Sequence, residues 1–106
     1  MNRLATLQEF LKRDPDDSET HYAIALEFAS QHLYPEAISK LQELIKVDPV
    51  YVPAYQYLGG IYSRLGEFDN ALRIYENGVR VAQHSGNSHA AYEMQEAIDE
   101  LIDGDL

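Results

Sequence analysis

The 106-residue sequence lacks cysteine and tryptophan and is poor in basic residues, with 8 Lys and Arg against 18 Asp and Glu. Without cysteine there is no disulfide, thiolate nucleophile or thiolate metal site. The formal net charge of −10 argues against nucleic-acid and membrane partners, because both present negative charge to a protein. No apolar run is long enough for a signal peptide or a membrane span, so we expect a cytoplasmic protein.

What the sequence does contain is enough apolar material for one core. A chain of this length corresponds to a single domain, here 1–106. Hydrophobic residues make up 45% of the chain. A domain of this size buries about two thirds of the surface of its unfolded chain.

A repeat with a fixed period runs through the sequence. Pro15 recurs as Pro49 and Ala37 recurs as Ala71, and both pairs are 34 positions apart (49 − 15 and 71 − 37). The twelve-residue stretches that end at the two prolines share six identities: Leu7/Leu41, Gln8/Gln42, Glu9/Glu43, Lys12/Lys46, Asp14/Asp48 and Pro15/Pro49. A period of this length indicates a stack of repeated structural units.

Within each copy the apolar residues are spaced as on one face of a helix. Tyr55, Leu58 and Tyr62 follow one another at steps of three and four, and a second such series begins at Ala71. Each copy is therefore expected to form two amphipathic helices. With the capping signals, the sequence predicts six helices, over 3–13, 17–31, 35–47, 52–65, 69–83 and 88–103.

The expected helix ends carry capping residues. Asp16 stands three positions before Glu19, which is a plausible capping pair for a helix that starts at about Asp17. Gly66 can adopt the left-handed conformation that ends a helix. His32 stands at the matching place in the first copy, although a histidine tolerates that conformation less well.

These features resemble the tetratricopeptide repeat (TPR), which has the same period. The matching residues of the second copy are Tyr55, Leu58, Gly59, Tyr62, Ala71 and Tyr75. The first copy is a weaker match, with His21, Ile24, Ala25, Phe28 and Ala37 at the corresponding positions. The resemblance implies an all-α fold, a short right-handed superhelical array of antiparallel helix hairpins.

The same frame divides the chain into a half-repeat helix over 1–14, two repeats over 15–48 and 49–83, and a capping helix over 88–103. Small residues are expected where the helices of a hairpin cross, with Gly59 opposite Ala71. The family frame would bury carboxylates in the last helix, which is unfavourable. A shift by two positions instead gives an apolar stripe of Ala91, Met94, Ile98 and Leu101.

The resemblance also implies a concave groove, lined by the first helix of each hairpin, in which a peptide or helix of a partner lies. The groove positions are Tyr22, Leu26, Gln56, Tyr57, Gly60, Arg64, Tyr92, Glu93 and Glu96. Three tyrosines, one cation and an acidic wall predict a partner segment with apolar or aromatic anchors and at least one Lys or Arg.

One subgroup of this family holds the acidic C-terminal tails of chaperones with a clamp of Lys and Asn side chains. The corresponding positions here are Tyr22, Leu26, Gln56 and Tyr57. Arg64 alone does not make a clamp for two carboxylates, so this ligand is not expected.

No arrangement of residues in the sequence predicts catalysis, a metal site or a cofactor. The four histidines, at 21, 32, 84 and 89, have no pair one helical turn apart. We therefore expect a non-enzymatic adaptor. The alternative is a structural module that self-associates through the stripe of Leu4, Leu7, Phe10 and Leu11. We therefore expect the chain to be either a monomer or a weak homo-oligomer.

Overall fold

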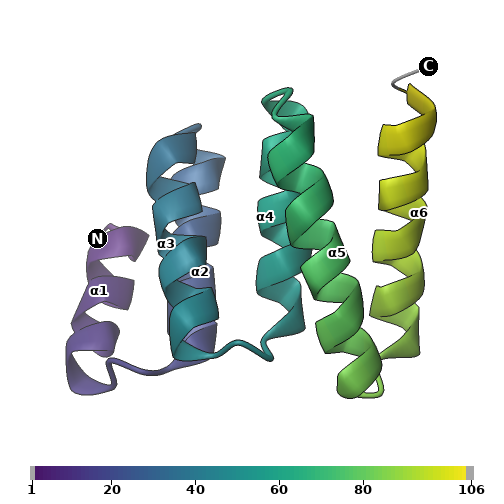
Figure 1. The fold of residues 1–106 in the computed structure, drawn as a ribbon. Coiled ribbons are helices and arrows are strands. Elements are labelled where there is room, and N and C mark those ends of the chain that lie inside the picture. Colours follow the sequence, from purple (N-terminus) through teal and green to yellow (C-terminus); the bar gives the residue numbers. More distant parts are fainter. Residues whose placement is uncertain (1, 105–106) are drawn as a thin grey trace. The chain divides into compact units, whose positions relative to one another are not determined.

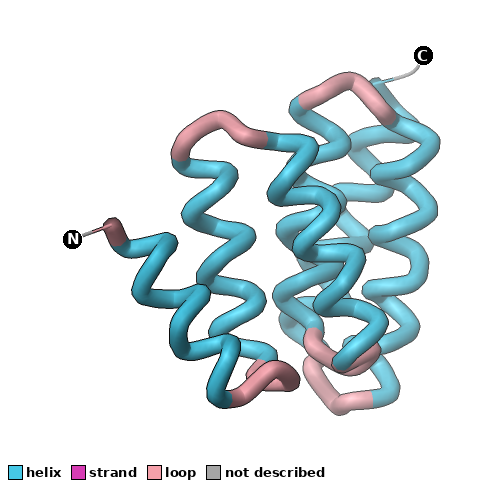
Figure 2. Tube along the Cα trace, turned by 90° about the vertical axis from the view of Figure 1, so that its left-hand side faces the viewer, coloured by secondary structure: helices cyan, strands magenta, loops and turns pink. Residues whose placement is uncertain are grey.

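The computed structural model describes residues 2–104, in which every regular element is an α-helix (Figure 1). The helices are α1 (Arg3–Arg13), α2 (Ser18–Ser30), α3 (Tyr34–Val47), α4 (Val52–Arg64), α5 (Phe68–His84) and α6 (Ser88–Gly104). Short loops join consecutive helices (Figure 2). The six expected helices and the all-α class are confirmed, with bounds that differ by at most one residue.

The described chain divides into two compact units, with the division after Tyr51. In the first unit, α2 packs against both α1 and α3. Its core includes Ile24, Ala25, Ala37, Leu41 and Leu44, all at most 1% exposed. Because Ala25 and Ala37 carry only a methyl group, the backbones of α2 and α3 can approach closely. Helix α1 contributes no buried residue to this core.

In the second unit, α5 packs against both α4 and α6. The close approach of α4 and α5 is at Gly59, where an added Cβ would lie 2.5 Å from Cε1 of Tyr75. The three nearest atoms to that position all belong to the ring of Tyr75. Ala71, one turn earlier on α5, is fully buried.

The start of α2 is capped by Asp17 and not by the expected pair of Asp16 and Glu19. The Asp17 carboxylate accepts a hydrogen bond from the Thr20 backbone N–H at 3.0 Å. Helix α2 therefore begins at Ser18, and Asp17 is the residue from which a side chain reaches the third N–H of the helix. The Thr20 hydroxyl also donates to the Asp17 carboxylate, and this hydrogen bond, followed by that from the backbone N–H, holds the pKa of Asp17 below its ordinary value.

Two equivalent turns close the hairpins with a residue in the left-handed conformation. His32 has φ 61° in the turn between α2 and α3, and Gly66 has φ 76° in the turn between α4 and α5. His32 thus fills the place of a glycine, as its sequence position predicted. Its Nδ1 lies 3.2 Å from the Tyr34 hydroxyl, a local contact that a glycine would lack.

The inward face of α6 follows the shifted frame. Ala91, Met94 and Ile98 are buried, and Leu101 is half-buried. The carboxylates that the unshifted frame would bury remain in solvent. The two-residue shift arises because α5 extends to His84 and the loop that follows places the start of α6 at Ser88.

Candidate partner-binding faces

The first unit presents an aromatic pair on the candidate groove positions of α2. Tyr22 and Leu26 are both half-buried. The Tyr22 ring packs against the ring of Tyr51, with centroids 5.6 Å apart and planes tilted by 59°. Sequence reasoning named Tyr22 but missed Tyr51, which lies in the loop just before α4 and carries no helical spacing signal.

Carboxylates border this aromatic pair. The pKa of Tyr51 is raised, first by burial and then by the negative charges of Glu19, Asp48 and Asp17. Asp48 accepts a hydrogen bond from the Ser18 hydroxyl at 2.6 Å, which fixes its carboxylate at the start of α2. The first-unit face therefore combines two aromatic rings with negative charge.

The second unit brings two of the predicted residues together. The side-chain amide of Gln56, on α4, donates to a Glu93 carboxylate oxygen on α6 over 3.5 Å. The same oxygen lies 3.5 Å from His89 Nε2. Glu93 thus stands between α4 and a histidine one turn earlier on its own helix.

The other predicted residues of α4 lie along its length. Tyr57 and Gly60 are half-buried, and Arg64 is exposed in the last turn. An added Cβ at Gly60 would meet only the Tyr75 hydroxyl, at 3.9 Å. Burial raises the pKa of Tyr75, and a hydrogen bond with Ser63 opposes that shift.

Tyr75 therefore reaches the candidate face from the neighbouring helix. Sequence reasoning placed Tyr75 only in the core. Helical periodicity predicts that its ring is buried, but it does not predict the position of the hydroxyl group at the end of the ring. The structure places this hydroxyl near Gly60, on a tyrosine that is itself buried.

Tyr92 and Glu96 lie on another flank of α6. Tyr92 is 65% exposed, and a hydrogen bond to Glu96 raises the pKa of its phenol. Tyr92 lines a hollow of about 410 Å³ that includes Val79 and Gln83 of α5. The structure thus brings Glu93 to Gln56 of α4 and places Tyr92 beside α5.

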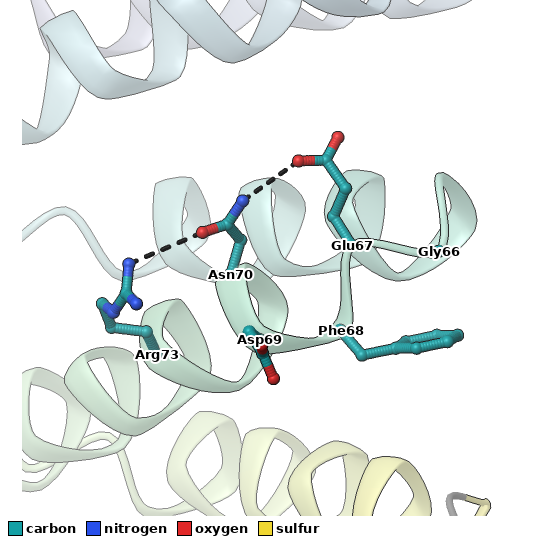
Figure 3. Close-up of a pocket in the computed structure, with 6 residues that line it drawn as sticks. All are labelled: Gly66, Glu67, Phe68, Asp69, Asn70 and Arg73. Atoms are coloured by element: carbon teal, nitrogen blue, oxygen red, sulfur yellow. Dashed lines mark hydrogen bonds between the residues drawn. The ribbon is translucent and has the colours of Figure 1, made fainter.

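A further hollow, of about 540 Å³, lies at the turn between α4 and α5 and includes none of the predicted residues (Figure 3). Arg73 donates to the side chain of Asn70 over 3.5 Å, and Asn70 donates to Glu67 at 3.0 Å. The Phe68 ring points away from this chain of hydrogen bonds (Figure 3). The polar groups of the turn therefore bind one another.

Within residues 2–104, no group of three His, Cys, Asp or Glu side chains is arranged to hold a metal ion. In the same range no helix combines the length and the apolar character that crossing a membrane requires.

No family model matches the chain. A tetratricopeptide repeat domain protein from Salinibacter ruber, solved in solution, matches at 35% identity with a TM-score of 0.79, over 83% of this chain and 89% of that one. The chain belongs to the tetratricopeptide repeat family. Its repeats are thus TPR units, as the 34-residue period and the residues from Tyr55 to Tyr75 predicted.

Two other TPR proteins match over most of the chain. The TPR2B domain of yeast Sti1, solved in complex with pHsp70, has a TM-score of 0.86 over 95% of this chain and 81% of that one, and at 23% identity it shows the shared fold. Hsp70-Hsp90 organizing protein 2 of Arabidopsis thaliana is 26% identical over 96 residues. This match covers 91% of the present chain and 14% of the Arabidopsis protein, so the chain spans a small part of that relative.

Proposed function

We propose that this TPR chain is a non-enzymatic adaptor that holds a peptide or helical segment of a partner protein on the first-helix faces of its repeats. The partner segment carries at least one Lys or Arg and an apolar or aromatic anchor. The binding residues are the predicted groove positions of α2 and α4 and Glu93 of α6, together with Tyr51.

The observation that carries this proposal is the packing of Tyr22 on Tyr51 beside the carboxylates of Glu19 and Asp48. Tyrosine offers a large contact area with few rotatable bonds, so it loses little entropy when it is immobilised. Ring faces attract cations, and neighbouring carboxylates add to that attraction. The combination favours a basic partner side chain over an acidic one.

The second unit supports the same ligand chemistry. Glu93 keeps its carboxylate on the surface beside Gln56, and Tyr57 supplies an aromatic surface on α4. The formal charge of −10 adds a long-range attraction for basic segments, which speeds association and weakens with salt.

The Sti1 domain offers a precedent for a ligand on this fold, since it was solved with pHsp70. The positions at which the chaperone-binding subgroup has its Lys and Asn clamp hold Tyr22, Leu26, Gln56 and Tyr57 here. We therefore propose that the present chain uses the same helices for a ligand of opposite charge.

A selection from a random peptide library displayed on phage tests the proposal. Peptides that bind the chain should be enriched in Lys or Arg next to aromatic or branched apolar residues. Their affinity, measured by fluorescence anisotropy, should fall at least tenfold in Tyr22→Ala and in Glu93→Lys.

Two matched variants serve as controls. Tyr34→Ala removes a half-buried tyrosine at the turn between α2 and α3, and Glu76→Lys reverses an exposed carboxylate on α5. Both should bind the selected peptides as the wild type does. Selection of acidic peptides, or equal losses in the control variants, would contradict the proposal.

A further inference from the structure

Helix α1 exposes an apolar side chain at a position that is buried in the related helix α3. Phe10 aligns with Leu44 at the 34-residue offset. Leu44 is fully buried, whereas Phe10 is 56% exposed. Thr6, Glu9 and Arg13 border Phe10 around a shallow hollow of about 170 Å³. The part of α1 around Phe10 is thus uncovered in the described chain, whereas Leu7, which aligns with Leu41, is half-buried.

This exposed face belongs to the most basic helix of an acidic protein. Helix α1 holds Arg3, Lys12 and Arg13 against Glu9, which is three of the 8 Lys and Arg of the whole chain in 11 residues. Arg3 lies 3.6 Å from Glu27 of α2, and Lys12 lies 3.0 Å from Glu9. Arg13, one turn after Phe10, is exposed.

A second uncovered face lies on α5 and α6. The lining of the hollow of about 410 Å³ beside Tyr92 includes Val79, Ala91 and Gln95. Ile102, further along α6, is 52% exposed. Tyr92, Gln95 and Ile102 are spaced as on one side of a helix. This face therefore offers apolar surface beside an opening that a large side chain can enter.

The charge of α6 is opposite to that of α1. Helix α6 holds five carboxylates and no Lys or Arg: Glu93, Glu96, Asp99, Glu100 and Asp103. Asp99 accepts a hydrogen bond from Gln95 at 3.2 Å, which places its carboxylate next to the hollow. Asp103 follows one turn later.

We propose that these two faces bind each other between copies of the chain. Phe10 of one copy enters the hollow beside Tyr92 of the next, and Arg13 and Lys12 lie against Asp99 and Asp103. The charge complementarity of α1 and α6 selects a second copy as the occupant. In this contact, α1 of one copy packs on α6 of the next. Because the sequence of α1 matches that of α3, which is the second helix of a hairpin, α1 takes the place of a second helix after α6.

Such a contact is heterologous, since it joins two different patches, and it gives either a closed ring or an open head-to-tail chain. The mass therefore rises above that of the monomer as the concentration rises. The electrostatic part weakens with added salt.

Sedimentation equilibrium on a pair of charge-reversed variants tests this arrangement. The first variant is Lys12→Glu/Arg13→Glu, and the second is Asp99→Lys/Asp103→Lys. The wild type should exceed the 12.1 kDa monomer mass increasingly with concentration. Each variant alone should stay monomeric, because its two ends then carry the same charge.

An equimolar mixture of the two variants restores opposite charges at every contact, so the mixture should associate again. No structural damage to either variant would produce this rescue. Lys46→Glu, at the position of α3 that aligns with Lys12, serves as the control for a charge reversal in the last turn of a helix and should associate as the wild type does.

The apolar part of the contact is tested by Phe10→Ser against Phe68→Ser. The two phenylalanines are exposed to a similar extent, 56% and 53%, on different helices. Phe10→Ser should weaken association at least tenfold and Phe68→Ser should leave it unchanged. A wild type that is monomeric at every concentration, or a mixture that does not associate, would overturn the proposal.

Discussion

Gly59 on α4 lies directly against the ring of Tyr75 on α5, so that a Cβ at position 59 would stand 2.5 Å from Cε1 of that ring. Gly60, its neighbour, has only the Tyr75 hydroxyl nearby, at 3.9 Å. Two adjacent glycines in one helix therefore have different roles. The first permits the close approach of two helices, and the second is a local weakness of α4.

We expect opposite effects when each glycine is replaced by alanine. Alanine is favoured over glycine within a helix by about 1 kcal/mol, and Gly60→Ala should raise the free energy of unfolding by about that amount. Gly59→Ala should lower it by up to about 2 kcal/mol, because overpacking a rigid ring costs about 1–3 kcal/mol and the helix preference of alanine offsets about 1 kcal/mol of that cost. Urea denaturation followed by circular dichroism measures both changes. An equal gain in both variants would contradict the close contact with Tyr75.

The turn after α2 is strained where the turn after α4 is not. His32 has φ 61°, in the region that costs a non-glycine residue about 1–2 kcal/mol. His32→Gly should therefore stabilise the protein by about 0.5–1 kcal/mol, after the greater flexibility of glycine in the unfolded chain is subtracted. Gly66→Ala should destabilise it by about 1 kcal/mol, since it creates the same strain in the second turn. Thermal unfolding of the two variants provides the comparison, and a loss of stability in His32→Gly would be inconsistent with this account.

The cap of α2 gives one predicted dependence on pH. The pKa of Asp17 is held below its ordinary value by the Thr20 hydroxyl and backbone N–H. The stability that this shift contributes is present above the pKa of an unfolded Asp, about 3.9, and is lost as the pH falls through the lower pKa of the folded state.

Asp17→Asn keeps a capping side chain that does not titrate. As the pH falls below about 4, the melting temperature of the wild type should therefore fall relative to that of Asp17→Asn. The control is Asp16→Asn, because the carboxylate of Asp16 does not cap the helix. A difference that stays constant with pH would exclude the proposed contribution of the cap.

The sequence predicted those features that depend on period and spacing. The offset between Pro15 and Pro49, and the series from Tyr55 to Tyr75, were enough for the TPR fold and for all six helices. The shifted frame of α6 followed from the cost of burying Glu93 and Glu96. Each of these arguments concerns which side of a helix a residue occupies, and periodicity determines that.

The close approach at Gly59 was expected, but other features that depend on how one element approaches another were missed. Gly78 was not singled out, yet a Cβ there would lie 2.8 Å from Cβ of Tyr55 and 2.5 Å from the sulfur of Met94. Tyr51 was missed because a loop residue has no periodic signal, although it completes the aromatic pair with Tyr22. Tyr92 was assigned to the groove by its register, and its place beside Val79 depends on how α6 is rotated against α5.

The central claim is that the first-helix faces hold a partner segment, and photo-crosslinking tests it most directly. A benzophenone amino acid would replace Tyr22, Tyr57 or, as the control, Tyr34 in separate samples. Each sample would then be irradiated with a peptide from the library selection, and the crosslinked residues identified by mass spectrometry. We predict crosslinks from positions 22 and 57 to that peptide, and none from position 34. Crosslinks from position 34 alone would place binding outside these faces and contradict the account.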